Sequence, residues 1–226
     1  MKKDRRMGDF GMGTAFQPLQ EVRAYWEGLR SGSEPPARAS LDPRGMERSL
    51  ENVFLIERVA HGVARFRLAG MHLVQLLGME VRGMPLTALF EPAARDQVME
   101  ATEAVFASPS ILTLALAGDR GLGRPAIEAR MLLLPVMGDT GSCDRALGCL
   151  VTLGLIGRSP RRFSVTREVS EPLQPQVWPA VAIERAALSA RQPDPARELA
   201  EAQRPFLLQP KRSAGRGHLR LVKSDE

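Results

Sequence analysis

The sequence predicts an α+β fold in which a five-stranded antiparallel sheet is covered by helices on one face. Three observations predict it. Two strand-like runs joined by His61-Gly62 form a predicted β-hairpin. A helical region follows the hairpin, and three further strand-like runs come after that region. Strands that gather in two groups around a block of helices are typical of the α+β class.

The composition is that of an ordinary globular protein. The chain has 226 residues, of which 44% are hydrophobic and 25% are charged, enough for a substantial core. No apolar run approaches the ~20 residues of a membrane-spanning helix, and the basic N-terminus lacks the apolar segment of a secretion signal. The only cysteines are Cys143 and Cys149, which indicates a reducing compartment. We therefore expect a cytoplasmic protein that does not enter a membrane.

The positive charge is concentrated near the C-terminus. The net charge is +5, and residues 204–226 contribute +4 of it through six basic and two acidic side chains. The rest of the chain is close to neutral. The sequence pI of about 9.8 is therefore weak evidence that the folded part binds nucleic acid.

The first predicted helix follows a segment, residues 1–17, that is rich in glycine and charge and is expected to be disordered. Pro18 suits a first helical turn, and Gly32 and the Pro35-Pro36 pair end the helix. Its apolar residues recur at helical spacing in a narrow stripe: Leu19, Val22, Trp26 and Leu29. This stripe, our candidate interaction surface, either docks on the domain or pairs with its copy in a homodimer, and docking is favoured.

The predicted hairpin consists of residues 52–60 and a strand that begins at Val63. In the second strand Ala64, Phe66 and Leu68 alternate with other residues, so they are expected on one face. The residues from there to Phe90 are apolar and rich in methionine, without a clean period. Such short helical turns commonly wall a cavity because thioether chains fill irregular gaps, although plain core packing is the favoured explanation for any one of these residues.

A longer amphipathic helix is predicted to begin at Pro92 and to end by Ser108-Pro109. Its apolar stripe consists of Ala94, Val98, Ala101 and Val105. Two acidic residues lie outside this stripe, and we expect them on a solvated face of the helix: Glu100 and Glu103.

Three more strands are predicted at residues 111–117, 126–136 and 147–156. In the last of these, Gly148 and Gly154 would share one face and allow something to pack closely. Residues 18–163 therefore form the predicted domain. Residues 164–226 are interpreted as a proline-rich linker and basic tail, mostly disordered, with weak helices at 181–191 and 196–204.

Five segments carry a resemblance to a known family: YWEGLR at 25–30, LDPRGME at 41–47, ARFRLAGMHLVQLLGMEVRGMPLTALF at 64–90, GRPAIEARMLLLPV at 123–136 and RALGCLVTLGLIGRSPRRF at 145–163. Over residues 19–163 the chain resembles a PAS domain, and within that fold the single-domain bacterial PAS_5 family. The resemblance implies a bacterial regulator: a sensing and dimerisation module of signal transduction, without catalytic activity, whose sheet and helices enclose a cavity. It does not imply a particular ligand, because fold does not dictate function.

Cofactor motifs are weak. A flavin photosensor of this fold needs a reactive cysteine in a helical Asn-Cys-Arg motif, whereas Cys143 and Cys149 are predicted in a loop and a strand. A haem sensor needs an axial ligand, and only His72 is placed to face the cavity. A hydrogen-bonded histidine in the wall is the favoured interpretation. The cofactor therefore stays unknown.

Motifs for catalysis are missing as well. No P-loop, dinucleotide fingerprint, nucleophile elbow or cluster of metal ligands is present in the sequence. Arg158 and Arg162 have the spacing of some cyclic-dinucleotide receptors, in which guanidinium groups bind phosphates. The second half of that receptor motif does not follow, so we favour a solvated basic linker. We expect neither an enzyme nor a metal protein.

Three functional hypotheses remain. The first is a sensory or adaptor protein that binds a small molecule and reports it to an unidentified signalling protein, with these pocket candidates: Phe66, Leu68, Met71, His72, Leu76, Met84, Val98, Met131 and Cys149. The second is a nucleic-acid-associated regulator that uses the basic residues 211–223, which contain no aromatic residue for base stacking. The third is an interaction module whose cavity is filled by its own side chains.

Overall fold

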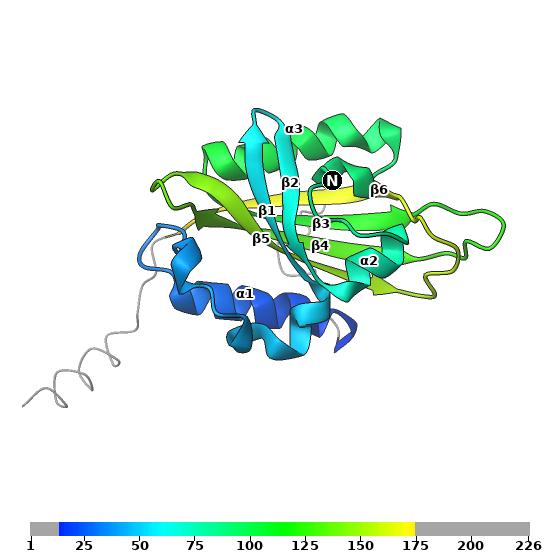
Figure 1. Cartoon of the computed structure of the whole chain (residues 1–226), viewed down its shortest axis with the longest axis horizontal. Helices are drawn as coiled ribbons and strands as arrows, with labels where there is room; N and C mark the ends of the chain where they lie inside the picture. The colour runs from blue at the N-terminus through cyan, green and yellow to red at the C-terminus, as the bar shows by residue number, and fades with distance from the viewer. Residues whose placement is uncertain (1–13, 175–226) are drawn as a thin grey trace, which may run out of the picture. The chain divides into compact units, whose positions relative to one another are not determined.

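The computed structural model describes residues 14–174, and these form one antiparallel sheet with helices on both faces (Figure 1). The sheet has the strand order β2-β1-β5-β4-β3-β6. Its strands are β1 (Val53–Ala60), β2 (Val63–Ala69), β3 (Ser110–Gly118), β4 (Glu128–Met137), β5 (Cys143–Leu153) and β6 (Phe163–Pro172). The predicted α+β class, the hairpin and the antiparallel sheet are confirmed. The predicted count of five strands is wrong by one.

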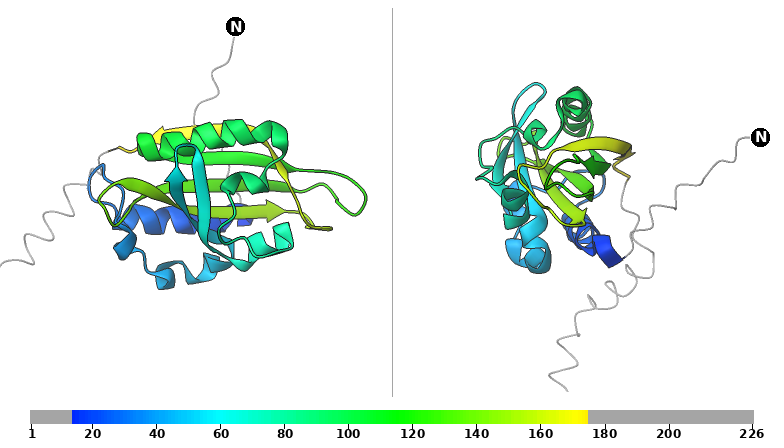
Figure 2. Two further views of the ribbon diagram at one scale, coloured as in Figure 1. Left: turned by 45° about the horizontal axis from the view of Figure 1, so that its top comes forward. Right: turned by 90° about the vertical axis from the view of Figure 1, so that its right-hand side faces the viewer.

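Helices form a layer on each side of the sheet, as the views in Figure 2 show. On the inner face lie α2 (Met71–Leu77), η4 (Leu86–Leu89), η5 (Pro92–Ala94) and α3 (Arg95–Ala107). On the outer face lie η1 (Thr14–Phe16), α1 (Gln17–Leu29) and η3 (Pro43–Asn52), and the short η2 (Arg38–Ser40) precedes η3. None of these helices is long and apolar enough to cross a membrane.

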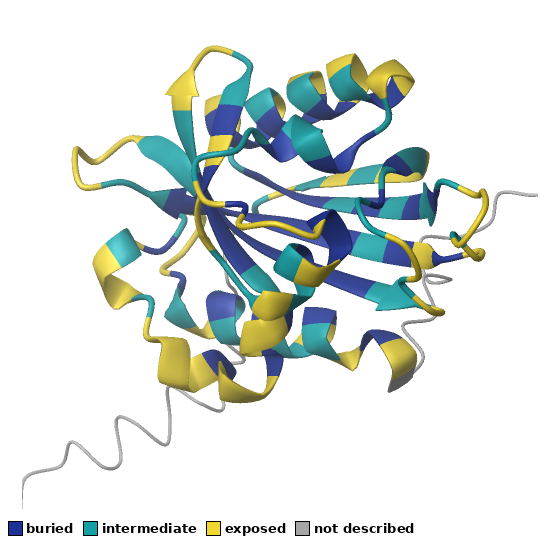
Figure 3. Ribbon diagram, turned by 45° about the vertical axis from the view of Figure 1, so that its right-hand side comes forward, coloured by how far each residue is buried: buried dark blue, intermediate teal, exposed yellow. Residues whose placement is uncertain are grey.

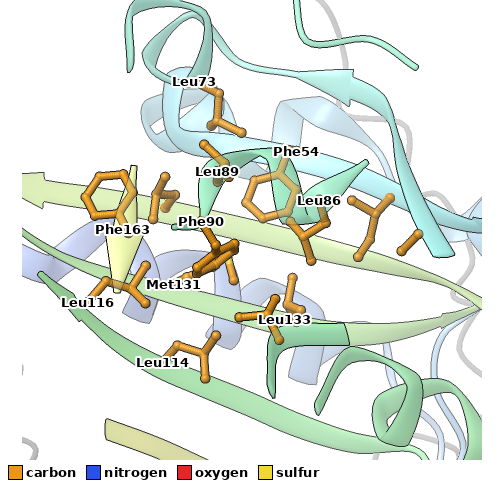
Figure 4. Close-up of a cluster of buried hydrophobic side chains, with 14 of the residues drawn as sticks. Phe54, Leu73, Leu86, Leu89, Phe90, Leu114, Leu116, Met131, Leu133 and Phe163 are labelled. Atoms are coloured by element: carbon orange, nitrogen blue, oxygen red, sulfur yellow. The ribbon is translucent and has the colours of Figure 1, made fainter. Parts of the chain in front are cut away.

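The inner layer is a dense apolar cluster (Figure 4). Four phenylalanines from different parts of the chain are fully buried in it: Phe54, Phe66, Phe90 and Phe163. The rings of Phe54 and Phe66 meet edge to face with centroids 5.4 Å apart. Gly148 on β5 lies directly beneath Phe54, where a Cβ atom would come within 2.1 Å of the ring. The close packing predicted at Gly148 is therefore present.

The outer layer buries the apolar stripe of α1. Leu19, Val22 and Trp26 are at most 2% exposed against β4 and β5, and Leu29 is only partly buried. The Trp26 indole Nε1 donates a hydrogen bond of 2.9 Å to the carbonyl oxygen of Pro135. The stripe therefore docks on the domain, as favoured, and its apolar side chains are covered by the sheet.

The sixth strand corrects the predicted domain boundary. The sequence predicts a linker from residue 164 onward, yet β6 pairs with β3 from Phe163 to Pro172. Most β6 side chains are partly or fully exposed at this edge of the sheet, so the strand has no strong apolar alternation to reveal it (Figure 3). At the other terminus, residues 14–17 belong to η1 and α1 and not to a disordered segment. Residues 1–13 and 175–226, with the predicted tail helices and the basic segment 211–223, lie outside the described residues.

Candidate functional site

The inner layer brings together five of the nine candidate pocket residues. Phe66, Leu76, Val98 and Met131 are at most 1% exposed within one cluster, and Met84 packs against it. Figure 4 shows Met131 beside Phe90 and below Phe54. These residues form a continuous apolar core between the sheet and its inner helices. The sequence predicted them in the wall of a ligand cavity, but none of the five lines the pocket described below.

Leu68 does not belong to this cluster, because β2 contains a β-bulge. Leu55 pairs with Leu68 while Ile56 pairs with Phe66, so Arg67 is an extra residue in the ladder. An extra residue moves every later side chain to the opposite face of a strand. Leu68 is consequently 56% exposed on the outer face, and its predicted position is wrong.

Met71 and Cys149 are also not in the inner layer. Met71 is 61% exposed because the inner stripe of α2 is Leu73, Leu76 and Leu77, which lie on the other side of the helix. Cys149 lies on the outer face beneath α1, since β5 is covered on both faces and its apolar pattern does not distinguish them. Burial raises the pKa of the Cys149 thiol to about 12.

His72 forms a contact between α2 and β5. Its Nε2 lies 3.1 Å from the Thr152 hydroxyl oxygen, and burial lowers the pKa of the imidazole. The favoured interpretation of a hydrogen-bonded histidine agrees with this contact. Across residues 14–174 no group of three or more His, Cys, Asp or Glu side chains is arranged to hold a metal ion.

A pocket opens at the border of the inner layer, between the β1–β2 hairpin, the start of η4 and α3. We call it the hairpin–helix pocket. Its volume is about 210 Å³. Apolar groups make up most of the wall, together with the exposed Asp96 and the partly buried Arg95. Its lining residues are Gly62, Val63, Ala64, Pro85, Leu86, Thr87, Arg95, Asp96, Met99 and Thr102.

Thr102 is the chemically distinctive residue of this pocket. It is only 4% exposed, and its hydroxyl oxygen has no hydrogen-bond partner in the described part of the chain. A buried hydroxyl without a partner typically costs about 1–3 kcal/mol, so it is rarely left in a core without a role. A threonine hydroxyl can both donate and accept. The sequence does indicate that Thr102 is buried, because it lies one helical turn from Val98 and one from Phe106 on the buried face of α3.

Glu103, next to Thr102, holds the hairpin against α3. Its carboxylate accepts a 3.0 Å hydrogen bond from the backbone N–H of Gly62, forms an ion pair with Arg58 and lies 3.1 Å from His61 Nδ1. We call these groups the Glu103 cluster. The expectation that Glu103 is solvated is wrong: its side chain is 12% exposed, because the hairpin folds over this side of α3. Glu100 is exposed, as expected.

The Glu103 cluster and the hairpin–helix pocket share a wall. Gly62 belongs to both and has a left-handed backbone, with φ of +70°. A Cβ atom at this position would lie 2.9 Å from the sulfur of Met99, so Met99 packs directly on the turn. A molecule in the pocket therefore contacts the segment that Glu103 holds.

A second group of charged residues lies at the other end of the strands from the Glu103 cluster. Arg161 is fully buried and donates to Asp119 Oδ1 at 3.0 Å and to the carbonyl oxygens of Ile156, Asp119 and Pro125. We call it and its acceptors the Arg161 cluster. Arg162 donates to the carbonyl oxygen of Ala88. The interpretation of this segment as a solvated linker is therefore wrong for Arg161 and Arg162. Their guanidinium groups already bind protein acceptors.

Comparisons with known proteins were made against solved structures, curated proteins and family models. The solved structure of a variant of RsLOV matches with a TM-score of 0.35 and 18% identity, over 64% of this chain and 72% of that chain. None of the curated proteins matches the chain. The model of the PAS_5 family, described as a PAS domain, matches residues 15–151, which is more than half of the chain. The chain therefore belongs to the PAS_5 family of PAS domains.

Proposed function

We propose that this PAS domain is a non-catalytic sensor that binds a small, mostly apolar molecule in the hairpin–helix pocket and reports it to a signalling protein. Membership of the PAS family makes the chain a sensory signalling domain. The observation that carries the proposal of a small ligand is Thr102, which lines this pocket and whose buried hydroxyl has no hydrogen-bond partner in the described part of the chain. A ligand with one hydrogen-bonding group would satisfy it.

The size of the pocket limits the ligand. A cavity of about 150 Å³ holds one benzene molecule, and the hairpin–helix pocket measures about 210 Å³. A single ring with short substituents, or an aliphatic molecule of similar size, fits that volume. Arg95 and Asp96 contribute one charge of each sign, so the pocket favours a molecule without net charge.

The proposed response is a change in how the hairpin contacts α3. The Glu103 cluster combines partly exposed ion pairs, each worth about 0–1 kcal/mol, with one hydrogen bond to a carboxylate, worth about 1.5–3 kcal/mol. A ligand that binds one hairpin position a few kcal/mol better than another is sufficient to shift such an equilibrium. The signalling protein would then recognise the position of the hairpin.

The proposal is tested by a screen of monocyclic phenols, alcohols and amides against the full chain, followed by titration calorimetry. We expect Thr102→Val to weaken the best binders about tenfold, since one hydrogen bond to a buried group is lost. Thr113→Val is the matched control, because Thr113 is a partly buried threonine on β3 outside the pocket. Equal affinity for both variants would refute the assignment of the pocket.

Location and partner remain predictions. We place the protein in the cytoplasm, with an unidentified signalling protein as its partner. The alternative role in nucleic-acid binding depends on residues 211–223, which the structure does not describe.

A further inference from the structure

A second concave surface lies on the outer face of the hairpin, away from the inner layer. We call it the outer groove. It has a volume of about 210 Å³ and lies between β1, β2 and β5 on one side and η2 and η3 on the other. Its floor consists of Leu55, Leu68 and Leu147, and its wall of Leu41, Met46 and Leu50.

The floor is a row of leucines across three strands. Leu55 on β1 pairs with Leu68 on β2 and with Leu147 on β5, so the three side chains lie side by side on one face. The bulge at Arg67 produces this row, because it turns Leu68 outward. Two interstrand spacings make the floor about 10 Å long, the length of an extended chain of about eight carbons.

The groove is open to solvent. Leu68 is 56% exposed and Leu50 is 38% exposed, although both are large aliphatic side chains within one concave surface. The deeper floor residues, Leu55 and Leu147, are at most 7% exposed. An apolar surface of this kind on a folded domain commonly marks a binding site.

A single cation borders the groove. Arg38 on η2 lines it and is partly buried, and its guanidinium forms no ion pair or side-chain hydrogen bond with any residue between 14 and 174. Elsewhere on the outer face, Arg23 is paired with Glu171 at 2.7 Å and Arg30 with Glu27 at 2.9 Å. Arg38 thus adds one positive charge without a protein partner among the described residues to the lining of an apolar groove.

We propose that the outer groove binds an aliphatic carboxylate of about eight carbons. The hydrocarbon chain lies along the leucine floor, and the carboxylate accepts two parallel hydrogen bonds from the Arg38 guanidinium. The charge of Arg38 complements an anionic head group, and the floor matches the tail in length. This site is independent of the hairpin–helix pocket.

The test is titration calorimetry of the full chain with sodium butanoate, hexanoate, octanoate and decanoate below their micelle concentrations. We expect affinity to rise about fourfold per methylene up to about eight carbons and then to level off. Octan-1-ol and octylamine, which have the same tail without the carboxylate, should bind at least tenfold more weakly than octanoate. Equal affinity for octanoate and octan-1-ol would overturn the role of Arg38.

Two pairs of variants locate the site. Arg38→Gln should weaken octanoate about tenfold or more, whereas Arg82→Gln, which removes an exposed arginine outside the groove, should not. Leu68→Asn should abolish the gain per methylene, whereas Leu122→Asn, at a leucine that is 94% exposed in the β3–β4 loop, should not. Octanoate binding that is unchanged in both Arg38→Gln and Leu68→Asn would refute the proposal.

Two further measurements distinguish octanoate binding in the outer groove from binding in the hairpin–helix pocket and from self-association. Thr102→Val should leave octanoate affinity unchanged, so failure of the hairpin–helix pocket and failure of the outer groove are distinguishable. Sedimentation velocity of the wild type and of Leu68→Asn reports self-association. If the wild type forms dimers that Leu68→Asn disrupts and octanoate does not bind, the groove is an interface between copies, and the proposal is wrong.

Discussion

Two charged clusters fix the sheet at opposite ends of its strands, and they differ in their access to water. Arg161 is fully buried and has four protein acceptors, whereas Glu103 is 12% exposed and its partners Arg58 and His61 are 34% and 85% exposed. The pairing of Val53 with Cys149 and of Glu57 with Arg145 puts the hairpin turn and the 154–162 loop at opposite ends of β1 and β5.

The difference shows how one sheet can have a fixed end and an adjustable one. A buried charge without its partners is very costly, so the Arg161 cluster holds its loop in one position. A partly exposed carboxylate can exchange its partners for water at low cost. The hairpin–helix pocket borders the adjustable end, where the proposed ligand would need to supply only a few kcal/mol to shift the hairpin.

The largest effect is expected at Arg161. Arg161→Met removes one of the donors to Asp119 and the Arg161 donor of three carbonyl oxygens, and we expect it to lower the free energy of unfolding by about 3–5 kcal/mol. Arg158→Met, at an exposed arginine of the same loop, should change it by less than about 0.5 kcal/mol. Urea denaturation of both variants measures the difference. Similar small losses in both would show that the fixed end does not depend on Arg161.

The same cluster should make the fold sensitive to acid. Burial alone would raise the pKa of Asp119, but the Arg162 backbone N–H and the guanidinium groups of Arg161 and Arg124 hold it below its ordinary value. A depressed pKa means that this stabilisation is complete above about pH 3.9, the pKa in the unfolded chain, and is lost as pH falls through the folded-state pKa. Asp119→Asn should flatten the stability profile below about pH 3.9, measured by urea denaturation at each pH. A profile that keeps its wild-type slope would contradict this origin.

A smaller effect is expected at the hairpin. Glu103→Ala removes the acceptor of the Gly62 N–H and the partner of Arg58, and we expect a loss of about 1–3 kcal/mol. Hydrogen exchange should quicken at the hairpin and remain unchanged at the 154–162 loop. Glu100→Ala, at an exposed glutamate on α3, is the control. Uniform acceleration across the sheet would mean that the hairpin does not open separately.

The smallest effect compares the two thiols. Cys143 contacts the carbonyl oxygen of Val105 on α3, and burial raises the pKa of Cys143 to about 11 and that of Cys149 to about 12. Both should react slowly with iodoacetamide at neutral pH, because the thiolate is the reactive form. Because Cys143 begins β5 at the hairpin end, Glu103→Ala should accelerate its labelling and leave Cys149 unchanged, as peptide mass spectrometry would show. Parallel acceleration of both thiols would indicate global unfolding.

The sequence was sufficient to predict the elements whose patterns are periodic. The stripe of α3 and the hairpin were predicted correctly because burial of one face imposes a spacing that can be read directly. The face on which Leu68 lies could not be predicted, since one extra residue in β2 reverses it and leaves no mark in composition. Cys149 belongs to a strand that is apolar on both faces, so the sequence could not show on which face of the sheet Cys149 lies.

Polar residues accounted for a further group of errors. Glu103 and Arg161 looked solvated because charge usually indicates exposure, yet each is held by acceptors or donors that lie far away in the sequence. The interactions that hold the two ends of the sheet are thus long-range ones. Thr102 was not singled out, because it is not a member of the apolar stripe that the spacing predicted and the missing partner of its hydroxyl is evident only in the structure.

The position of β1 between β2 and β5 has a consequence for the synthesis of the protein. The β1–β2 hairpin can form as soon as residue 69 has left the ribosome, but the other edge of β1 must wait for β5, which ends at Leu153. At 5–20 residues per second, that delay is roughly 5–20 s. During it, Phe54 and Ile56 remain without most of their native neighbours beside an unpaired strand edge, a surface that chaperones recognise.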